Sequence, residues 1–434
     1  GAPLGAADLQ NVKKLFGMNP DESFAVPDDV RQAYQQVAAQ GAAQEVAWNK
    51  AFAAYAAKHP ESAADFTRRL DHTLLAGDWK AKLPVYDPAD TKAVATRQRS
   101  EQVLNAVASA FPEVMGGSAD LTPSNLTSLK CSSDFQAATP GGRYIRFGVR
   151  EHAMAAICNG MFAHGGLRPY CATFLNFIGY ALGSFRLSCL SQFGVMYVMT
   201  HDSIGLGEDG PTHQPVEMLS TLRSHPNCLV MRPADGNETV GAYIQAMEHT
   251  HTPTVLALSR QGVPTLARSS AEKVAFGGYI VSEVGCAEGA TPDLIMVATG
   301  TEVSLTIDAA AEFHKNSSKS VRVISMPCCE LFDKQPLSYR LSLFPDNVPV
   351  MSVEALSVYG WSKYAHYTVG MTSFGMSAPG GKVYDAFGFT VPKLAVRATE
   401  AVEHYRNMKA GCATMPSLMR LLQSHSVVPA NSGH

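Results

Sequence analysis

Hydrophobic and polar positions follow two different patterns in two parts of the chain. Residues 32–70 are rich in alanine, and Trp48, Phe52 and Tyr55 recur there at helical spacing, which predicts a helical arm. Beyond Arg97, short apolar runs alternate with stretches of helical periodicity. Because these runs stay apolar without alternating, they indicate parallel strands that are buried on both faces.

The apolar runs also divide the chain. The runs predicted to be strands are Gly194–Asp202, Asn227–Asp235, Pro253–Gln261, Asp293–Thr301, Ser320–Cys328 and Val348–Leu356. A loop-rich stretch near residues 266–273 separates the first three from the last three. We therefore predict the α/β class, with two doubly wound, mostly parallel-sheet domains preceded by a helical arm. The expected limits are residues 1–70, 71–270 and 271–434, with a flexible polar tail.

Composition and charge argue against nucleic acids and membranes as partners. The 434 residues include 35 Lys and Arg against 38 Asp and Glu, so neither sign of charge dominates. No apolar run approaches the roughly 18 residues that cross a bilayer. Nine cysteines without CxxC spacing favour a reducing compartment, and we expect a cytoplasmic protein. The final Ser-Gly-His matches the peroxisomal Ser-Lys-Leu signal poorly and assigns no organelle.

Polar residues gather in the loop after the strand predicted to end at Thr200. The stretch GLGEDGPTHQP, together with His201, places Asp209 and His213 among glycines and prolines. Three interpretations stay open: a transition-metal site, whose ligand types fit but whose spacing does not, a structural loop, and an active-site loop. In the last, glycine lets a ligand approach the backbone. Ligands of doubly wound sheets bind at strand exits, where Asp202, Asp235, Arg260 and Glu302 also stand.

Three further sets of residues are candidates, each with a plainer structural alternative. Glu151 begins an alanine-rich helix, where a carboxylate commonly stabilises the helix end by about 0.3–1 kcal/mol. Phe174, Phe177 and Tyr180 recur every three residues, which suits core packing or the wall of a flat aromatic ligand. Basic and hydroxyl groups suited to a phosphate are Arg97, Ser124, His201 and Arg260.

Several strings occur together and in one order along the chain. They are GGSADLTPSN, RYIRFGVREHAM, TFLNF, THDSIGLGEDGPTHQPVE, RPADGNE, ALSRQ and ATGTEVS. This combination resembles the transketolase family of thiamine diphosphate enzymes, from Gly1 to about Arg406, and the string Thr200–Glu217 is the most specific part. The resemblance implies transfer of a two-carbon ketol unit from a ketose phosphate to an aldose phosphate, in the pentose phosphate pathway.

The resemblance assigns roles to the candidate residues. Glu151 matches the carboxylate that shifts the cofactor's aminopyrimidine to its imino form, so that the thiazolium carbon becomes a nucleophilic ylid. His213 matches a residue that contacts cofactor and donor, and we predict these two as catalytic. Asp209 matches a residue that recognises a donor hydroxyl, and Asp120 one beside the thiazolium. The pyrimidine wall is matched by Phe174, Phe177 and Tyr180, and the phosphate set by Arg97, Ser124, His201 and Arg260.

One departure limits the resemblance. Transketolases hold the diphosphate and its Mg²⁺ or Ca²⁺ on an N-terminal domain through Gly-Asp-Gly, and this sequence contains no such triplet. We therefore expect a chain that lacks this domain, that is inactive alone, and that still forms a homodimer with the site at the subunit interface. Sugar phosphates are the expected small-molecule partners. The alternatives are dihydroxyacetone synthase, or a non-catalytic or proteolytic module of the same enzyme.

Overall fold

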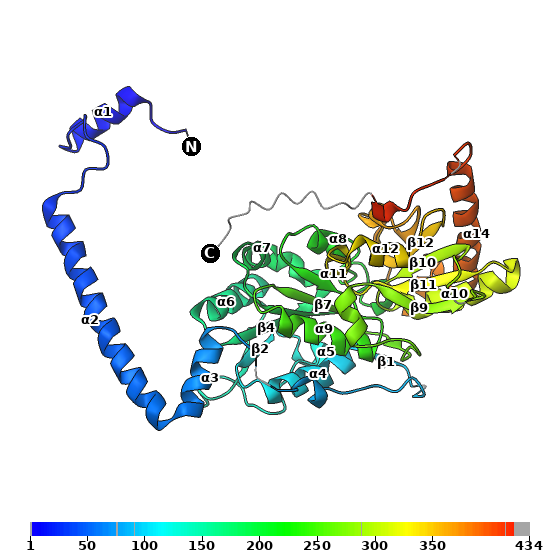
Figure 1. The fold of residues 1–434 in the computed structure, drawn as a ribbon, viewed down its shortest axis with the longest axis horizontal. Coiled ribbons are helices and arrows are strands. Elements are labelled where there is room, and N and C mark those ends of the chain that lie inside the picture. Colours follow the sequence, from blue (N-terminus) through cyan, green and yellow to red (C-terminus); the bar gives the residue numbers. More distant parts are fainter. Residues whose placement is uncertain (1, 75–76, 91, 288, 413, 421–434) are drawn as a thin grey trace. The chain divides into compact units, whose positions relative to one another are not determined.

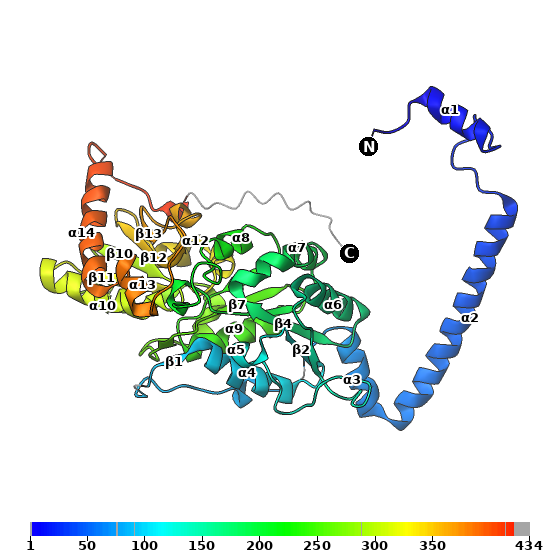
Figure 2. The same cartoon turned by 180° about the vertical axis from the view of Figure 1, so that it is seen from behind.

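The computed structural model describes residues 2–74, 77–90, 92–287, 289–412 and 414–420, and the predicted flexible tail, residues 421–434, lies outside them. The chain forms two compact units, Gly1–Thr67 and Arg68–His434. Figures 1 and 2 show the ribbon from opposite sides. None of the described helices is long and apolar enough to span a bilayer.

The first unit is helical. It contains α1 (Ala6–Leu15), α2 (Asp28–Lys58) and most of α3 (Pro60–Leu70). The predicted helical spacing brings Trp48 and Phe52 together, with ring centroids 5.8 Å apart, and Phe66 of α3 lies 5.7 Å from Phe52. Proline at the first position of α3 suits a helix start, because the missing N–H would have no partner there.

The second unit holds a sheet of six parallel strands, in the order β3-β2-β4-β5-β7-β6. Along β5, Met196 and Val198 join one buried cluster, whereas Tyr197 and Met199 join another on the opposite face. Helices α4 and α9 cover the first face, and α6 and α7 cover the second (Figure 1). The strands are β2 (Val114–Ser118), β3 (Tyr144–Arg146), β4 (Arg168–Phe174), β5 (Met196–Thr200), β6 (Leu229–Met231) and β7 (Thr254–Leu258). The helices are α4 (Thr96–Ala110), α6 (Glu151–His164), α7 (Leu182–Ser191) and α9 (Gly236–Glu248).

A second sheet of five strands follows in the same unit, in the order β13-β12-β10-β11-β9. Only β9 runs antiparallel to its neighbour. Helices α10 and α14 cover one face, and α11 and α12 the other. The strands are β9 (Tyr279–Val284), β10 (Leu294–Ala298), β11 (Val321–Ser325), β12 (Val350–Ser357) and β13 (Tyr367–Met371). The helices are α10 (Glu302–Ser317), α11 (Cys329–Asp333), α12 (Leu337–Leu343) and α14 (Val391–Met408).

The shorter elements complete the second unit. Strands β1 (Val94–Ala95) and β8 (Gly262–Val263) form a small antiparallel pair. Helices α5 (Thr122–Asn125) and α8 (Met218–Arg223) lie in connections between strands, and α13 (Gly380–Ala386) follows the last strand, β13. The short 3₁₀ helices are η1 (Lys80–Lys82), η2 (Leu175–Ala181), η3 (Ile204–Leu206), η4 (Glu272–Phe276), η5 (Trp361–Lys363) and η6 (Leu418–Arg420).

The predicted fold class is confirmed, and each of the predicted apolar runs contains a strand, from β5 to β12. Strand β2 was not predicted, because its Gly116-Gly117 pair is typical of a turn. A Cβ at Gly117 would lie 1.7 Å from the Ile145 carbonyl oxygen of β3, and one at Gly116 would lie 1.9 Å from that of Tyr170. Glycine is required here because the neighbouring strands approach closely. The domain limits at residues 70 and 270 stay predictions.

Candidate active site

The candidate site lies at the carboxyl ends of four neighbouring strands of the first sheet. Asp120 follows β2, Phe174 ends β4, His201 follows β5, and Arg260 comes shortly after β7. Because the strands are parallel, their carboxyl ends share one edge of the sheet. The topology therefore brings to one edge residues that are far apart in the sequence.

Two arginines and a histidine form a cationic cluster at this edge. Arg97, in the first turn of α4, donates through Nη1 to the Ser124 carbonyl oxygen at 2.7 Å, and its buried Nε has no partner among the residues that the structure describes. Burial and the nearby charge of Arg260 both lower the pKa of Arg97. Among the described residues, the only carboxylate within ion-pair distance of either arginine is the exposed Glu208, 3.8 Å from Arg260. An anion such as phosphate would relieve this repulsion and accept the free donors.

His201 lies at the centre of this cluster. Its side chain is almost fully buried, its backbone has a φ of +61°, and its Nδ1 lies 2.8 Å from the Thr200 hydroxyl oxygen. Burial, foremost, and the charges of Arg97 and Arg260, with His213, together lower the pKa of His201 to about 3. The imidazole is therefore neutral at physiological pH, with one donor and one acceptor nitrogen.

An aromatic row leads away from His201. The ring of Phe174 stacks on that of His201, with centroids 3.7 Å apart, and on that of Phe177 at 5.5 Å. His213 meets Phe177 edge-on at 5.1 Å, and the exposed Tyr180 follows at 6.2 Å. Phe177 and Tyr180 lie in the 3₁₀ helix η2, where three residues make one turn and side chains three apart align. The row offers a partly open apolar surface to a planar ring.

The predicted carboxylates are not joined to this row. Glu151 is the first residue of α6, Asp120 follows β2 with a φ of +59°, and Asp209 is exposed in the loop after β5. Within the described part of the chain, none of the three carboxylates forms a hydrogen bond or an ion pair. They stay predicted site residues, and their oxygens are free to accept from a ligand.

The glycines of the loop after β5 have a structural role that the sequence did not predict. A Cβ at Gly207 would lie 3.0 Å from the backbone nitrogen of Gly380, and one at Gly210 would lie 3.2 Å from Ser377 Cβ. These glycines therefore allow the loop to approach the second-sheet part of the unit closely, and their role towards a ligand stays a prediction. The sequence could not show this, because a glycine has the same signature whichever neighbour approaches it.

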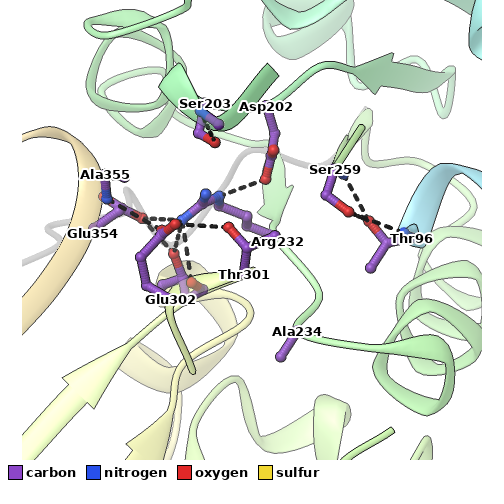
Figure 3. A network of polar contacts seen from close by, with 12 residues as sticks. Thr96, Asp202, Ser203, Arg232, Ala234, Ser259, Thr301, Glu302, Glu354 and Ala355 are labelled. Atoms are coloured by element: carbon purple, nitrogen blue, oxygen red, sulfur yellow. Dashed lines mark hydrogen bonds and ion pairs between the residues drawn. The ribbon is translucent and has the colours of Figure 1, made fainter. Parts of the chain in front are cut away.

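A buried ionic network beside the site was not predicted. Arg232 follows β6, is fully buried, and donates from Nε to Asp202 Oδ2 at 2.9 Å and from Nη1 to Glu302 Oε2 (Figure 3). Glu354 of β12 accepts two bonds from Arg223, both 2.9 Å long. Burial raises the pKa of Glu354, but its arginine neighbours, Arg223 foremost, bring it down to about 2. The sequence singled out Asp202 and Glu302 as strand-exit residues, and the charged Arg232 within an apolar run was the signal for the rest.

The loop shows no preformed metal site. Among the described residues, no group of three or more His, Cys, Asp and Glu side chains is arranged to hold a metal ion. His201 is occupied instead by its stacking on Phe174 and its bond to Thr200. The imidazoles therefore belong to the aromatic row and the cationic cluster.

Comparison with known families places three segments of the chain. Residues 92–265 match the family described as "Transketolase, pyrimidine binding domain" and residues 277–390 match "Transketolase-like TK C-terminal domain". Residues 1–74 match "Transketolase, thiamine diphosphate binding domain". The expectation that the chain lacks this domain was therefore wrong. The Gly-Asp-Gly triplet is a short part of such a domain, so its absence says nothing of the helices α1 to α3, which carry the match.

The relatives and solved structures agree with these matches. Transketolase 1 of Saccharomyces cerevisiae is 50% identical over 416 residues, which are 94% of this chain and 60% of the yeast protein. A chloroplastic transketolase of Craterostigma plantagineum is 46% identical over 93% of this chain and 77% of its own length. The crystal structure of the Pichia stipitis transketolase complex with sedoheptulose 7-phosphate superimposes with a TM-score of 0.89 and 48% identity, over 97% of this chain and 61% of that one. The chain thus spans about 60% of the length of the yeast relatives, and it belongs to the transketolase family.

Proposed function

We propose that this chain carries the sugar-phosphate site and the pyrimidine side of a transketolase active site, in a reaction that moves a two-carbon ketol unit from a ketose phosphate to an aldose phosphate. One observation carries the proposal, the cationic cluster of Arg97, His201 and Arg260, which adjoins an open aromatic row at one strand-exit edge. The Pichia stipitis relative, crystallised with a ketose phosphate, adds support.

The side chains of the cluster suit a phosphate. The buried donors of Arg97 and the guanidinium of Arg260 supply charge, and neutral His201 supplies one more donor or acceptor. Ser124 is the remaining member of the proposed phosphate set. Asp209 and His213 are proposed to bind the hydroxyls of the ketose nearer to the reacting carbon.

The aromatic row suits the aminopyrimidine of thiamine diphosphate, which is the proposed cofactor. Phe174 and Phe177 stack with an interplanar angle of 13°, and a flat ring can extend such a stack. When bound, this cofactor supplies a carbon nucleophile and an electron sink for ketol transfer. Glu151 is proposed to hydrogen-bond a pyrimidine nitrogen, because its carboxylate has no partner within the described part of the chain. Asp120 is proposed to lie on the thiazolium side.

The divalent cation enters the proposal only through the resemblance. The described residues offer no ligand cluster for Mg²⁺ or Ca²⁺, and the sequence contains no Gly-Asp-Gly. We therefore propose that the 434-residue chain, assayed alone with thiamine diphosphate and Mg²⁺, gives no ketol transfer. The sugar-phosphate site is tested by binding, which does not need turnover.

The proposed phosphate site predicts that Arg97→Gln loses affinity for ribose 5-phosphate but not for ribose. Calorimetric titration of the wild-type chain should show tighter binding of ribose 5-phosphate than of ribose, because only the first carries the anion. The substitution should raise the dissociation constant for ribose 5-phosphate about tenfold, as expected for the loss of one charge-assisted hydrogen bond. The dissociation constant for ribose should not change.

Arg99→Gln is the matched control for this experiment. Arg99 lies on the same helix, but its guanidinium stacks 4.0 Å above the ring of Tyr86 and away from the cluster. The control should bind both sugars as the wild type does. Equal binding of ribose and ribose 5-phosphate by the wild-type chain would contradict the phosphate assignment.

A homodimer is part of the proposal, and an exposed apolar surface supports it. Helices α6 and α7 are neighbours and leave Ile157, Leu187 and Leu190 about half exposed or more. Such a surface commonly marks a protein contact, and a two-fold dimer would pair it with its own copy. We expect Leu190→Ser to raise the dimer dissociation constant by about tenfold, from the loss of one buried leucine. Analytical ultracentrifugation measures this, and a wild-type chain that sediments as a monomer at all concentrations refutes the dimer.

A further inference from the structure

The loop that follows β5 is held by the second-sheet part of the unit through a tyrosine. Tyr384 of α13 donates to Glu302 Oε1 at 2.6 Å, and its oxygen lies 3.3 Å from the Ser203 hydroxyl. Gln261, just after β7, donates to the same tyrosine oxygen at 3.2 Å. One phenol therefore connects the second sheet to two strand-exit segments of the first.

Arg232 holds the adjacent residue of the loop. Its Nε bond to Asp202 and its Nη1 bond to Glu302 place one guanidinium between the two sheets (Figure 3). Nη1 also donates to the Thr299 carbonyl oxygen. Arg232 and Asp202 are each at most 1% exposed, so water does not compete for these bonds. Asp202 and Ser203 are thus both tied to the second sheet.

These two residues directly follow His201, whose backbone has a φ of +61°. Non-glycine residues rarely adopt this region, and they remain there only when the surrounding structure holds them. The bonds to Asp202 and Ser203 supply that restraint on the carboxyl side of His201. On its amino side, Thr200 continues into β5 and donates its hydroxyl to Asn125 at 2.7 Å.

We propose that Arg232 and Tyr384 are positioning residues, which hold His201 between the ring of Phe174 and the two arginines and thereby set the affinity of the site for a sugar phosphate. This inference rests on the proposed function for its ligand. The second-sheet part of the unit then has a defined task, because it contributes no residue to the cationic cluster but fixes the loop that does.

The experiment compares Tyr384→Phe with Tyr279→Phe. Tyr279 of β9 also donates a hydroxyl across the two sheets, to Glu238 of α9 at 2.7 Å and not to the loop after β5. Both variants lose one hydroxyl and keep the ring, so both should lower the unfolding midpoint. Only Tyr384→Phe should also weaken the binding of ribose 5-phosphate, by about threefold to tenfold, as expected for one lost hydrogen bond. Arg232→Lys keeps the positive charge but loses the paired donors of the guanidinium, so it should also weaken the binding of ribose 5-phosphate.

A second readout needs no ligand. In nitrogen-15 spectra of histidine-labelled protein, with His201 assigned through His201→Gln, its imidazole should be neutral throughout the folded range. Burial and the two arginines lower its pKa to about 3. In Tyr384→Phe its titration should move towards the ordinary histidine range, and in Tyr279→Phe it should not.

The outcomes separate this inference from the proposed function. If His201 titrates alike in the wild type and in Tyr384→Phe, the positioning role is refuted, whatever the sugar affinities are. If the titration moves only in Tyr384→Phe while the wild type binds ribose and ribose 5-phosphate equally, the positioning of His201 stands and the phosphate assignment falls. Equal losses of affinity in the two tyrosine variants would mean that lower stability, and not the position of His201, weakens binding. This outcome would also refute the inference.

Discussion

The Arg232→Met variant is expected to lose about 3–5 kcal/mol of unfolding free energy. Arg232 is fully buried and balances Asp202 and Glu302, whose side chains are at most 1% exposed. Methionine fills a similar volume but leaves two buried carboxylates without their cation. The cost is large because an uncompensated charge is left behind, and not because the ion pairs themselves stabilise strongly.

Urea unfolding followed by tryptophan fluorescence measures this loss, and Arg397→Met provides the control. Arg397 pairs with Glu400 on the surface of α14, with its side chain 54% exposed, so the same substitution should cost less than about 1 kcal/mol. Adding Glu302→Gln to Arg232→Met should restore part of the stability, because it removes one stranded charge. A loss in Arg232→Met no greater than that of the control would contradict the role of Arg232 at the contact between the sheets.

Stability is also expected to fall as the pH rises from about 4.5 to about 7, through Glu238 of α9. Glu238 is fully buried, and accepts from the Ala234 backbone at 2.7 Å and from the hydroxyls of Tyr279 and Ser325. Burial, foremost, and the charge of Asp235 together raise the pKa of Glu238 to about 7, against the lowering effect of the hydrogen bonds that it accepts. Between the two values the folded state keeps a proton that the unfolded state releases, so folding is favoured on the acid side.

The effect of Glu238 is isolated by subtracting the unfolding free energy of Glu238→Gln, because the glutamine side chain does not titrate. Between about pH 5 and about pH 8, the unfolding free energy of the wild type should fall by on the order of 2 kcal/mol relative to that of the variant. His201 contributes the opposite slope below its ordinary pKa of 6.5, but both proteins contain it and it cancels. Glu400→Gln is the control, because the pKa of Glu400 is lowered by its bond to Tyr367 and it is ionised over this whole range. A difference that is flat with pH, or that rises, would refute the assignment.

The predicted part of the fold came from side chains that report burial directly. Strands such as β5 and β10 are buried along their whole length, so their apolar runs are visible without any partner. The short strands β1 and β8, and the glycine-containing β2, carry no such run and were not predicted. Their existence depends on the strands beside them, which a local pattern does not describe.

Part of the candidate site was likewise visible in the sequence. The strings around Glu151 and in the loop after β5 carried the family resemblance, and the families and relatives that match the chain confirm it. The aromatic spacing of Phe177 and Tyr180 was also visible, because three-residue periodicity is a local property.

By itself, the sequence determined the α/β class, the transketolase family and the residue types available at the strand exits, because each of these follows from local pattern or from order along the chain. Only the tertiary structure decided that Arg97 and Arg260 converge on His201, that the loop glycines face the second sheet, and that Arg232 is balanced by Asp202 and Glu302. These features depend on distances between residues remote in sequence. The strand order of the first sheet sets these distances for the cationic cluster, and the contact between the two sheets sets them for the loop glycines and Arg232.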